Sequence, residues 1–170
     1  MGLLNRSKQA KPLLDGLTML PAAAGALREA GLRSTGVGSV CVRPVEGGSV
    51  GGSDRFELST DEFGYTWLTG RFAADDLTRL VEELHALVVS ADEAGFGPSL
   101  LCALVPFSDG TSTVGLIYRF RHGTWYPFVP TGKDQRDNAR ELQLRTQLGK
   151  DLDIEKDLAR WSPVWGAPGL

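Results

Sequence analysis

Residues 100–107 read LLCALVPF, and this almost unbroken apolar run decides the fold. Such a run is typical of a strand that is buried on both faces of a sheet. Asp109-Gly110 follows it and is a hairpin signal, because glycine accepts the positive φ that tight turns require. A second turn signal, His122-Gly123, separates residues 116–121 from residues 124–129. We therefore predict three consecutive antiparallel strands here.

Two helical regions precede these strands. Residues 12–31 predict a helix in two pieces, because Pro21 cannot donate a backbone hydrogen bond and starts the second piece or kinks the first. Residues 75–94 are the clearest helix, since Leu and Val recur there at three- and four-residue spacing. Gly95 is placed to end this helix.

Three further strands are predicted between the two helical regions. The first covers residues 40–42, and a hairpin joins residues 55–58 to residues 65–70. The Gly/Ser-rich residues 46–54 predict a flexible loop before this hairpin. The loop is too short to separate two domains.

Residues after Pro130 predict a further helix at 135–148, capped by Asp134. A last short helix is expected to run from a cap at Asp153 to Arg160. The expected buried side of the longer helix consists of Ala139, Leu142 and Thr146, with Leu148 left open.

Together these elements predict an α+β fold in the order α-βββ-α-βββ-α(α). We expect a largely antiparallel sheet of about six strands, with the helices packed on one face. A chain of 170 residues favours one domain, which we place at residues 12–170 behind a flexible arm at residues 1–11.

Composition and charge restrict the partners. The net charge is -3 and no basic stripe is present, so we expect no nucleic acid partner. No apolar run approaches the roughly 20 residues of a membrane span, and we expect a soluble cytoplasmic protein. The two leucines and three cations of residues 1–11 leave weak peripheral contact with the inner face of the membrane as an open alternative.

The sequence contains no recognisable catalytic or metal-binding pattern. Neither His85 nor His122 has a Cys, Glu or His at zinc-ligand spacing. The nucleophile elbow of hydrolases and the phosphate loop of nucleotide-binding proteins are also absent. We therefore expect no catalytic residues, no cofactor and no metal, and we interpret the protein as a binding protein.

The two cysteines, Cys41 and Cys102, each lie within a predicted apolar strand. We expect both to be buried free thiols in a reducing compartment. A disulfide bond between the two cysteines is the alternative.

The candidate partner-binding residues are an arginine pair and three tryptophans. Arg119, Arg121 and Trp125 flank one predicted hairpin, and Arg and Trp are enriched at interface hot spots. The alternative is an amphipathic sheet face whose tryptophan is covered by the C-terminal tail. In that tail, residues 161–170, Trp161 and Trp165 are too apolar to stay in water. They are expected to dock on the sheet, or otherwise to bind a partner.

Six stretches of the chain resemble the PspAB family of PspA-associated proteins from bacterial phage-shock-type membrane-stress systems. They cover the chain from end to end, and the C-terminal decapeptide is a specific match. The loop at residues 46–54 is shorter than in relatives. The matching stretches are residues 35–41 (TGVGSVC), 63–68 (FGYTWL), 95–102 (GFGPSLLC), 123–128 (GTWYPF), 136–139 (RDNA) and 161–170 (WSPVWGAPGL).

This resemblance implies association with PspA, a coiled-coil protein that binds stressed membranes, and a link with HtpX-type membrane proteases. It implies no catalytic activity. The order of elements is also similar to secretion-chaperone-like, YbjN-type domains, which bind other proteins and often form homodimers. The second functional reading is therefore a chaperone-like peptide- or protein-binding module unrelated to PspA.

Overall fold

The computed structural model describes residues 11–43 and 54–170 and has the predicted α+β fold. Its main sheet is antiparallel throughout, with the order β3-β4-β2-β5-β6-β7 and the short β1 beside β5. The predicted arm and the Gly/Ser-rich loop lie outside the described residues, apart from Lys11 and Asp54. The strands are β1 (Arg33–Ser34), β2 (Val37–Val42), β3 (Phe56–Thr60), β4 (Thr66–Arg71), β5 (Leu100–Ser108), β6 (Thr113–Arg119) and β7 (Thr124–Phe128).

The LLCALVPF run forms the interior strand β5, as its composition predicts. It pairs with β2 along one edge and with β6 along the other. Side chains on both faces of β5 are covered, with Ala103, Leu104 and Val105 at 0% exposure. The predicted hairpins β3–β4, β5–β6 and β6–β7 are all present.

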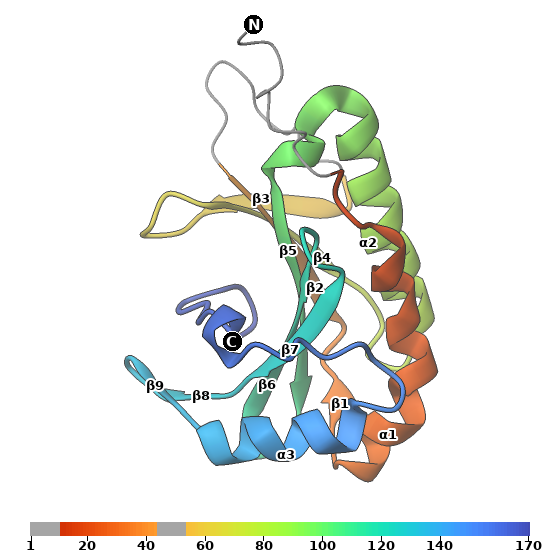
Figure 1. Cartoon of the computed structure of the whole chain (residues 1–170). Coiled ribbons are helices and arrows are strands. Elements are labelled where there is room, and N and C mark those ends of the chain that lie inside the picture. The colour runs from red at the N-terminus through yellow and green to blue at the C-terminus, as the bar shows by residue number, and fades with distance from the viewer. Residues whose placement is uncertain (1–10, 44–53) are drawn as a thin grey trace, which may run out of the picture.

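Helical segments cover one face of this sheet (Figure 1). They are the 3₁₀ segment η1 (Asp15–Ala23), the short helix α1 (Ala24–Glu29) and the long helix α2 (Leu77–Ala91). The Asp76 side chain caps α2 by accepting a hydrogen bond from the backbone N–H of Arg79 (3.1 Å). Gly38 of β2 lets α2 approach closely, because a Cβ there would meet the side chains of Leu80 and Leu84 at 2.6 and 2.9 Å. The π-helical η2 (Asp92–Phe96) and the 3₁₀ turn η3 (Gly97–Ser99) then lead into β5.

The C-terminal third of the chain wraps around the edge strand β7. Helix α3 (Asn138–Leu148) packs beside β7, and residues 153–155 then hydrogen-bond to Trp125 on that strand. After the single turn η4 (Leu158–Arg160), residues 161–170 cross the sheet face that the helices leave open (Figure 1). The tail therefore lies on the face opposite η1 and α2.

The prediction for the 135–148 helix is wrong in its start and in its buried side. Asp134 has a φ of 55°, in the turn of a small hairpin between β8 (Pro130–Gly132) and β9 (Gln135–Arg136), so it cannot cap a helix. Asp137 is the cap instead and accepts from the backbone N–H of Arg140 (2.9 Å). The helix packs by its other side: Ala139, Leu142 and Thr146 are exposed, and Glu141, Leu144 and Leu148 are buried.

Two smaller boundaries also differ from the predictions. Pro21 lies inside η1, and the second helical piece begins three residues later, at Ala24. The last helical turn is capped by Asp157, whose side chain accepts from the backbone N–H of Ala159 (3.0 Å). The backbone of Asp153 is instead used by the sheet, because its carbonyl accepts from the N–H of Trp125 (2.8 Å).

Candidate binding groove

A row of four side chains crosses the sheet on the face opposite the helices. The pairing register places Trp67 opposite Cys41, Cys41 opposite Cys102, and Cys102 opposite Arg119. Directly paired residues point to the same face of a sheet, so these four side chains lie in line. They form the floor of a groove of about 650 Å³, which we call the tail groove. This volume is within the range of ligand-binding sites in proteins.

The first wall of the tail groove is the tip of the β3–β4 hairpin. Asp61 organises this tip: its Oδ1 accepts from the backbone N–H groups of Phe63 (2.9 Å) and Tyr65 (3.0 Å), and its Oδ2 accepts from the indole Nε1 of Trp67 (2.9 Å). Such side-chain-to-backbone bonds fix a turn. Phe63 is 59% exposed and Tyr65 is 40% exposed, so the fixed turn presents two aromatic rings at the rim.

The second wall is formed by the tail residues 162–165, with Tyr126 behind them. The hydroxyl of Tyr126 donates to the backbone carbonyl of Ser162 (2.7 Å). Burial raises the pKa of Tyr126, so the phenol keeps the proton that it donates. Trp165 is half-buried and packs edge-to-face on Phe128, with ring centroids 5.0 Å apart. One part of its indole therefore stays open to the groove.

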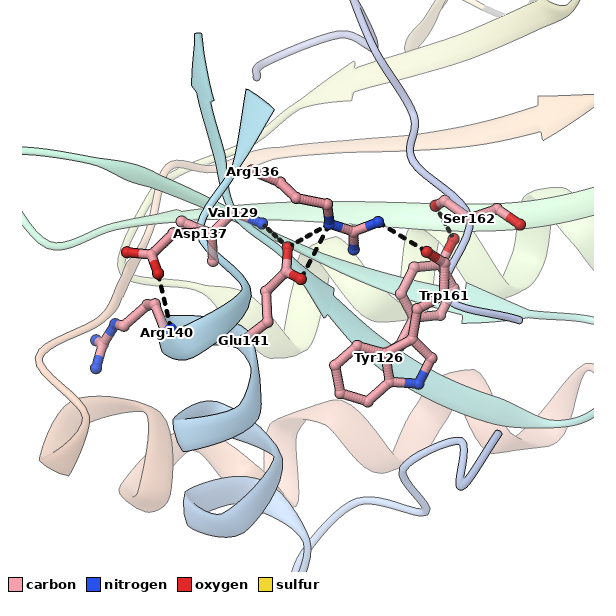
Figure 2. A network of polar contacts seen from close by, with 8 residues as sticks. All are labelled: Tyr126, Val129, Arg136, Asp137, Arg140, Glu141, Trp161 and Ser162. Carbon is pink, nitrogen blue, oxygen red and sulfur yellow. Dashed lines mark hydrogen bonds and ion pairs between the residues drawn. The ribbon is translucent and has the colours of Figure 1, made fainter. Parts of the chain in front are cut away.

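Trp161 fixes the start of the tail. It is 6% exposed, its ring stacks on Tyr126 at 6.1 Å, and its indole Nε1 donates to the carbonyl of Glu155 (2.9 Å). Its own carbonyl accepts from Nη1 of Arg136 (2.9 Å), as Figure 2 shows. A buried aromatic ring with both polar groups satisfied is a strong anchor for a chain end.

A buried ion pair holds Arg136 in the position from which it reaches the tail. The carboxylate of Glu141, on α3, accepts from Nε of Arg136 (2.9 Å) and from the backbone N–H of Val129 (2.9 Å; Figure 2). The guanidinium also lies over the ring of Phe128, 4.8 Å from its centroid. The tail, α3 and β7 are thus joined through one arginine.

Arg119 is the one charged side chain of the groove floor. It is partly buried, and its Nη1 donates to the carbonyl of Arg160 (2.8 Å). Within residues 11–43 and 54–170, no carboxylate oxygen lies within ion-pair distance of Arg119. Burial lowers the pKa of the neighbouring His122, and the positive charge of Arg119 lowers it further. Among the described residues, Arg119 thus has no direct ion-pair partner, and the carboxylate that lines the same groove, Asp61, is held by the hairpin wall.

The structure places the five candidate residues from the sequence in four different environments. Arg119 and Trp165 line the tail groove, Trp161 anchors the tail, and Arg121 is exposed outside the groove lining. Trp125 does not share a face with Arg119, so the first of the two interpretations that the sequence left open is wrong for this residue. It is paired with Tyr118 on the helix-covered face, is 1% exposed, and donates its indole N–H to the carbonyl of Gly16 (3.3 Å).

Sequence reasoning missed the hairpin wall and the ion pair behind the tail. The available signal for the wall was a pair of aromatic residues around Gly64 in a predicted turn, at Phe63 and Tyr65. Large apolar side chains that are exposed close together mark a candidate interaction site. The pairing of Arg136 with Glu141 had no such signal, because it depends on the unpredicted hairpin β8–β9.

Other kinds of site find little support in the parts of the chain that the structure describes. No group of three or more His, Cys, Asp or Glu residues is placed to hold a metal ion there. None of the described helices is long and apolar enough to cross a membrane.

The fold and the groove define the class: an α+β protein whose candidate site is a docking groove between a hairpin and its own C-terminal tail. The chain belongs to the PspAB family, because the family model described as PspA associated protein B matches residues 1–169. A search of curated proteins and a search of solved structures each gave no match. The likeness to YbjN-type domains therefore stays a prediction.

Proposed function

We propose that this protein acts by binding PspA in the membrane-stress response, without catalysing a reaction. The family is an accessory family named for its association with PspA, which supports this choice of partner. We assign the contact to the tail groove. The occupant is a segment of PspA that brings apolar side chains to the aromatic rim and a carboxylate to Arg119.

The observation that carries this assignment is the position of Arg119 on the groove floor, where no carboxylate of the described residues pairs with it directly. A partly buried guanidinium beside aromatic walls is incompletely solvated, and a carboxylate from a partner would form a charge-assisted hydrogen bond with it. Phe63 and Trp165 offer apolar contact on the two sides of the same charge. This combination of aromatic residues and arginine is the composition of interface hot spots.

A chaperone-like module unrelated to PspA is the second candidate. This candidate is favoured because the lining of the groove is not specific for one sequence. Its aromatic residues and Arg119 could bind any extended peptide that carries an apolar and an acidic residue. Such a module would bind unrelated acidic peptides as tightly as PspA. An HtpX-type membrane protease as partner and self-association of this protein stay further predictions.

The test is direct binding of the purified full-length protein to the PspA-type protein of the same cell, measured by isothermal titration calorimetry. Arg119→Glu should reduce the affinity about tenfold or more, because it places a negative charge where the partner's carboxylate would bind. A tenfold loss corresponds to about 1.4 kcal/mol of binding free energy. Arg121→Glu is the matched control, because it makes the same charge change on an exposed arginine outside the groove lining. It should bind within about threefold of the unchanged protein.

A second matched pair tests the aromatic rim. Phe63→Ser should weaken binding, whereas Met19→Ser, at a similarly exposed apolar residue on η1, should not. If Arg119→Glu and Arg121→Glu reduced the affinity for PspA equally, the tail groove would not be the binding site. No measurable heat with PspA, together with tight binding to unrelated acidic peptides, would instead favour the chaperone-like module.

A further inference from the structure

The two cysteines face each other across adjacent strands. Cys41 of β2 and Cys102 of β5 are direct partners in the antiparallel register, and both point to the floor of the tail groove. The Cα atoms of directly opposed residues are about 4.5–5.5 Å apart, which falls within the roughly 4.4–6.8 Å that a disulfide spans. Both thiols are free in the structure. A bond between them therefore needs no rearrangement of the fold.

The two thiols differ in access to solvent. Cys41 is 4% exposed, whereas Cys102 is partly exposed and lies next to Arg119 in the groove floor. The hydrogen bond with Cys102, together with burial, raises the pKa of Cys41 well above its usual range, so Cys41 keeps its proton. An oxidant that enters the groove consequently meets Cys102 first, with a protonated partner thiol directly beside it.

The local backbone allows the small adjustment that a new bond requires. The pairing between β2 and β5 shifts register directly after Cys41, which makes this pair the last regular step of the ladder. Irregular pairing of this kind locally loosens a ladder and increases its twist. The sulfur atoms can thus approach each other without displacing the strand centres.

We propose that Cys41 and Cys102 form a reversible disulfide across the groove floor when the protein meets hydrogen peroxide. In the first step the sulfur of Cys102 attacks one peroxide oxygen, the O–O bond breaks, and Cys102 sulfenic acid and water result. In the second step the sulfur of Cys41 displaces that hydroxyl group, which leaves as water with the Cys41 proton. The cysteines together lose two electrons and peroxide gains them. A reducing dithiol reverses the bond by thiol–disulfide exchange.

The bond would change the surface that the groove offers. Its two sulfur atoms lie between Trp67 and Arg119 in the row that crosses the floor. Joining them replaces two hydrogen-bonding thiols by one apolar, rigid bridge at the centre of that row. This inference does not depend on PspA being the partner, because it concerns the chemistry of the two thiols alone.

The experiment treats the folded full-length protein with increasing hydrogen peroxide, blocks the remaining thiols with N-ethylmaleimide, and records the intact mass. We expect a monomer that has lost two hydrogen atoms and takes up no blocking reagent, and that dithiothreitol returns to two reactive thiols. Peptide mapping without reductant should show Cys41 joined to Cys102. Addition of oxygen to Cys102, or dimers joined through Cys102, in place of this bond would overturn the proposal.

Two variants separate the steps. Cys41→Ser should stop at the sulfenic acid of Cys102, which dimedone captures, and Cys102→Ser should leave Cys41 unreactive while the protein is folded. Circular dichroism first establishes that each variant is folded, and the mass result for the unchanged protein holds without them. If Cys41 were oxidised as fast in Cys102→Ser as in the unchanged protein, the order of the steps would be wrong.

Discussion

Glu141 shows how one side chain can position a distant part of this molecule. It is 2% exposed, and its carboxylate serves both Arg136 and the backbone N–H of Val129 (Figure 2). Arg136 in turn donates to the carbonyl of Trp161 at the start of the tail. A buried carboxylate is tolerated only when it is paired and hydrogen-bonded, and here the same bonds join helix, strand and tail.

Removing this carboxylate should therefore be costly. Glu141→Ala leaves the Arg136 cation and the Val129 N–H without their acceptor, and we expect a loss of about 3–5 kcal/mol in the free energy of unfolding. Urea denaturation followed by far-ultraviolet circular dichroism measures it. The double variant Glu141→Leu with Arg136→Met should recover much of that loss, because no charge is left buried. If the Glu141→Ala variant were as stable as the unchanged protein, the Arg136–Glu141 ion pair would not stabilise the fold.

Trp125 shows why the face that a single residue occupies is harder to predict from sequence than the strand to which it belongs. The strand at residues 124–129 was predicted, but the turn at residues 120–123 pairs Arg119 with Thr124, so Trp125 falls opposite Tyr118. Adjacent residues of a strand point to opposite faces, and Trp125 is thereby directed into the helix-covered core. Which of two faces a residue occupies depends on contacts with η1 that no local pattern contains.

At the scale of single elements, the turn between β5 and β6 is the clearest case of local sequence determining local structure. Asp109 accepts hydrogen bonds from the backbone N–H and the hydroxyl of both Thr111 and Ser112. These bonds, led by the backbone N–H of Ser112, hold the pKa of Asp109 well below its ordinary value. The predicted Asp-Gly turn is thus fixed by the aspartate as well as by the glycine.

This turn should stabilise the fold in a pH-dependent way. Because the pKa of Asp109 is lower in the folded state, the unfolded state binds more protons as the pH falls below about 4, and the contribution of the carboxylate is then lost. Asp109→Asn should lower the melting temperature at pH 7, and the difference from the unchanged protein should shrink toward pH 3. Asp75→Asn, at an exposed residue for which the structure gives no hydrogen bond, is the control and should show no such trend. A constant difference across this range would contradict the assigned role.

Elements with strong local signals were predicted, and the element without one was not. The apolar run of β5, the Gly-containing hairpins and the periodic Leu and Val of α2 each carry their own signal. The α3 region is polar and contains two possible caps, Asp134 and Asp137. The choice between them is made by the β8–β9 hairpin and by the burial of Glu141, which are tertiary effects.

At the scale of the whole molecule, the two faces of the sheet are covered in different ways. Helical segments close one face, whereas the tail crosses the other, and the tail groove lies beside the tail (Figure 1). Its walls come from the hairpin at residues 61–67 and from residues 162–165, about a hundred positions apart in the chain. No local sequence pattern predicts that these two segments lie on opposite sides of one groove, although both carry exposed or half-buried aromatic residues.

The two tryptophans of the tail should accordingly have different roles, which the last prediction separates. Trp161 is buried and its indole Nε1 donates to the carbonyl of Glu155, so Trp161→Ala should lower the free energy of unfolding by about 3–5 kcal/mol. Trp165 is half-buried at the groove wall, so Trp165→Ala should cost less than about 2 kcal/mol but weaken PspA binding about tenfold.

Both quantities are measured on the same two full-length variants, by urea denaturation and by calorimetry with PspA. Iodide quenching adds a structural readout: fluorescence from Trp161 should be shielded, and fluorescence from Trp165 partly accessible until PspA is added. The comparison is meaningful because both residues belong to one tail, which stays attached in each variant. If Trp165→Ala were the more destabilising change, or if it bound PspA normally, the tail would serve the fold alone and the groove would lose one of its walls as a binding surface.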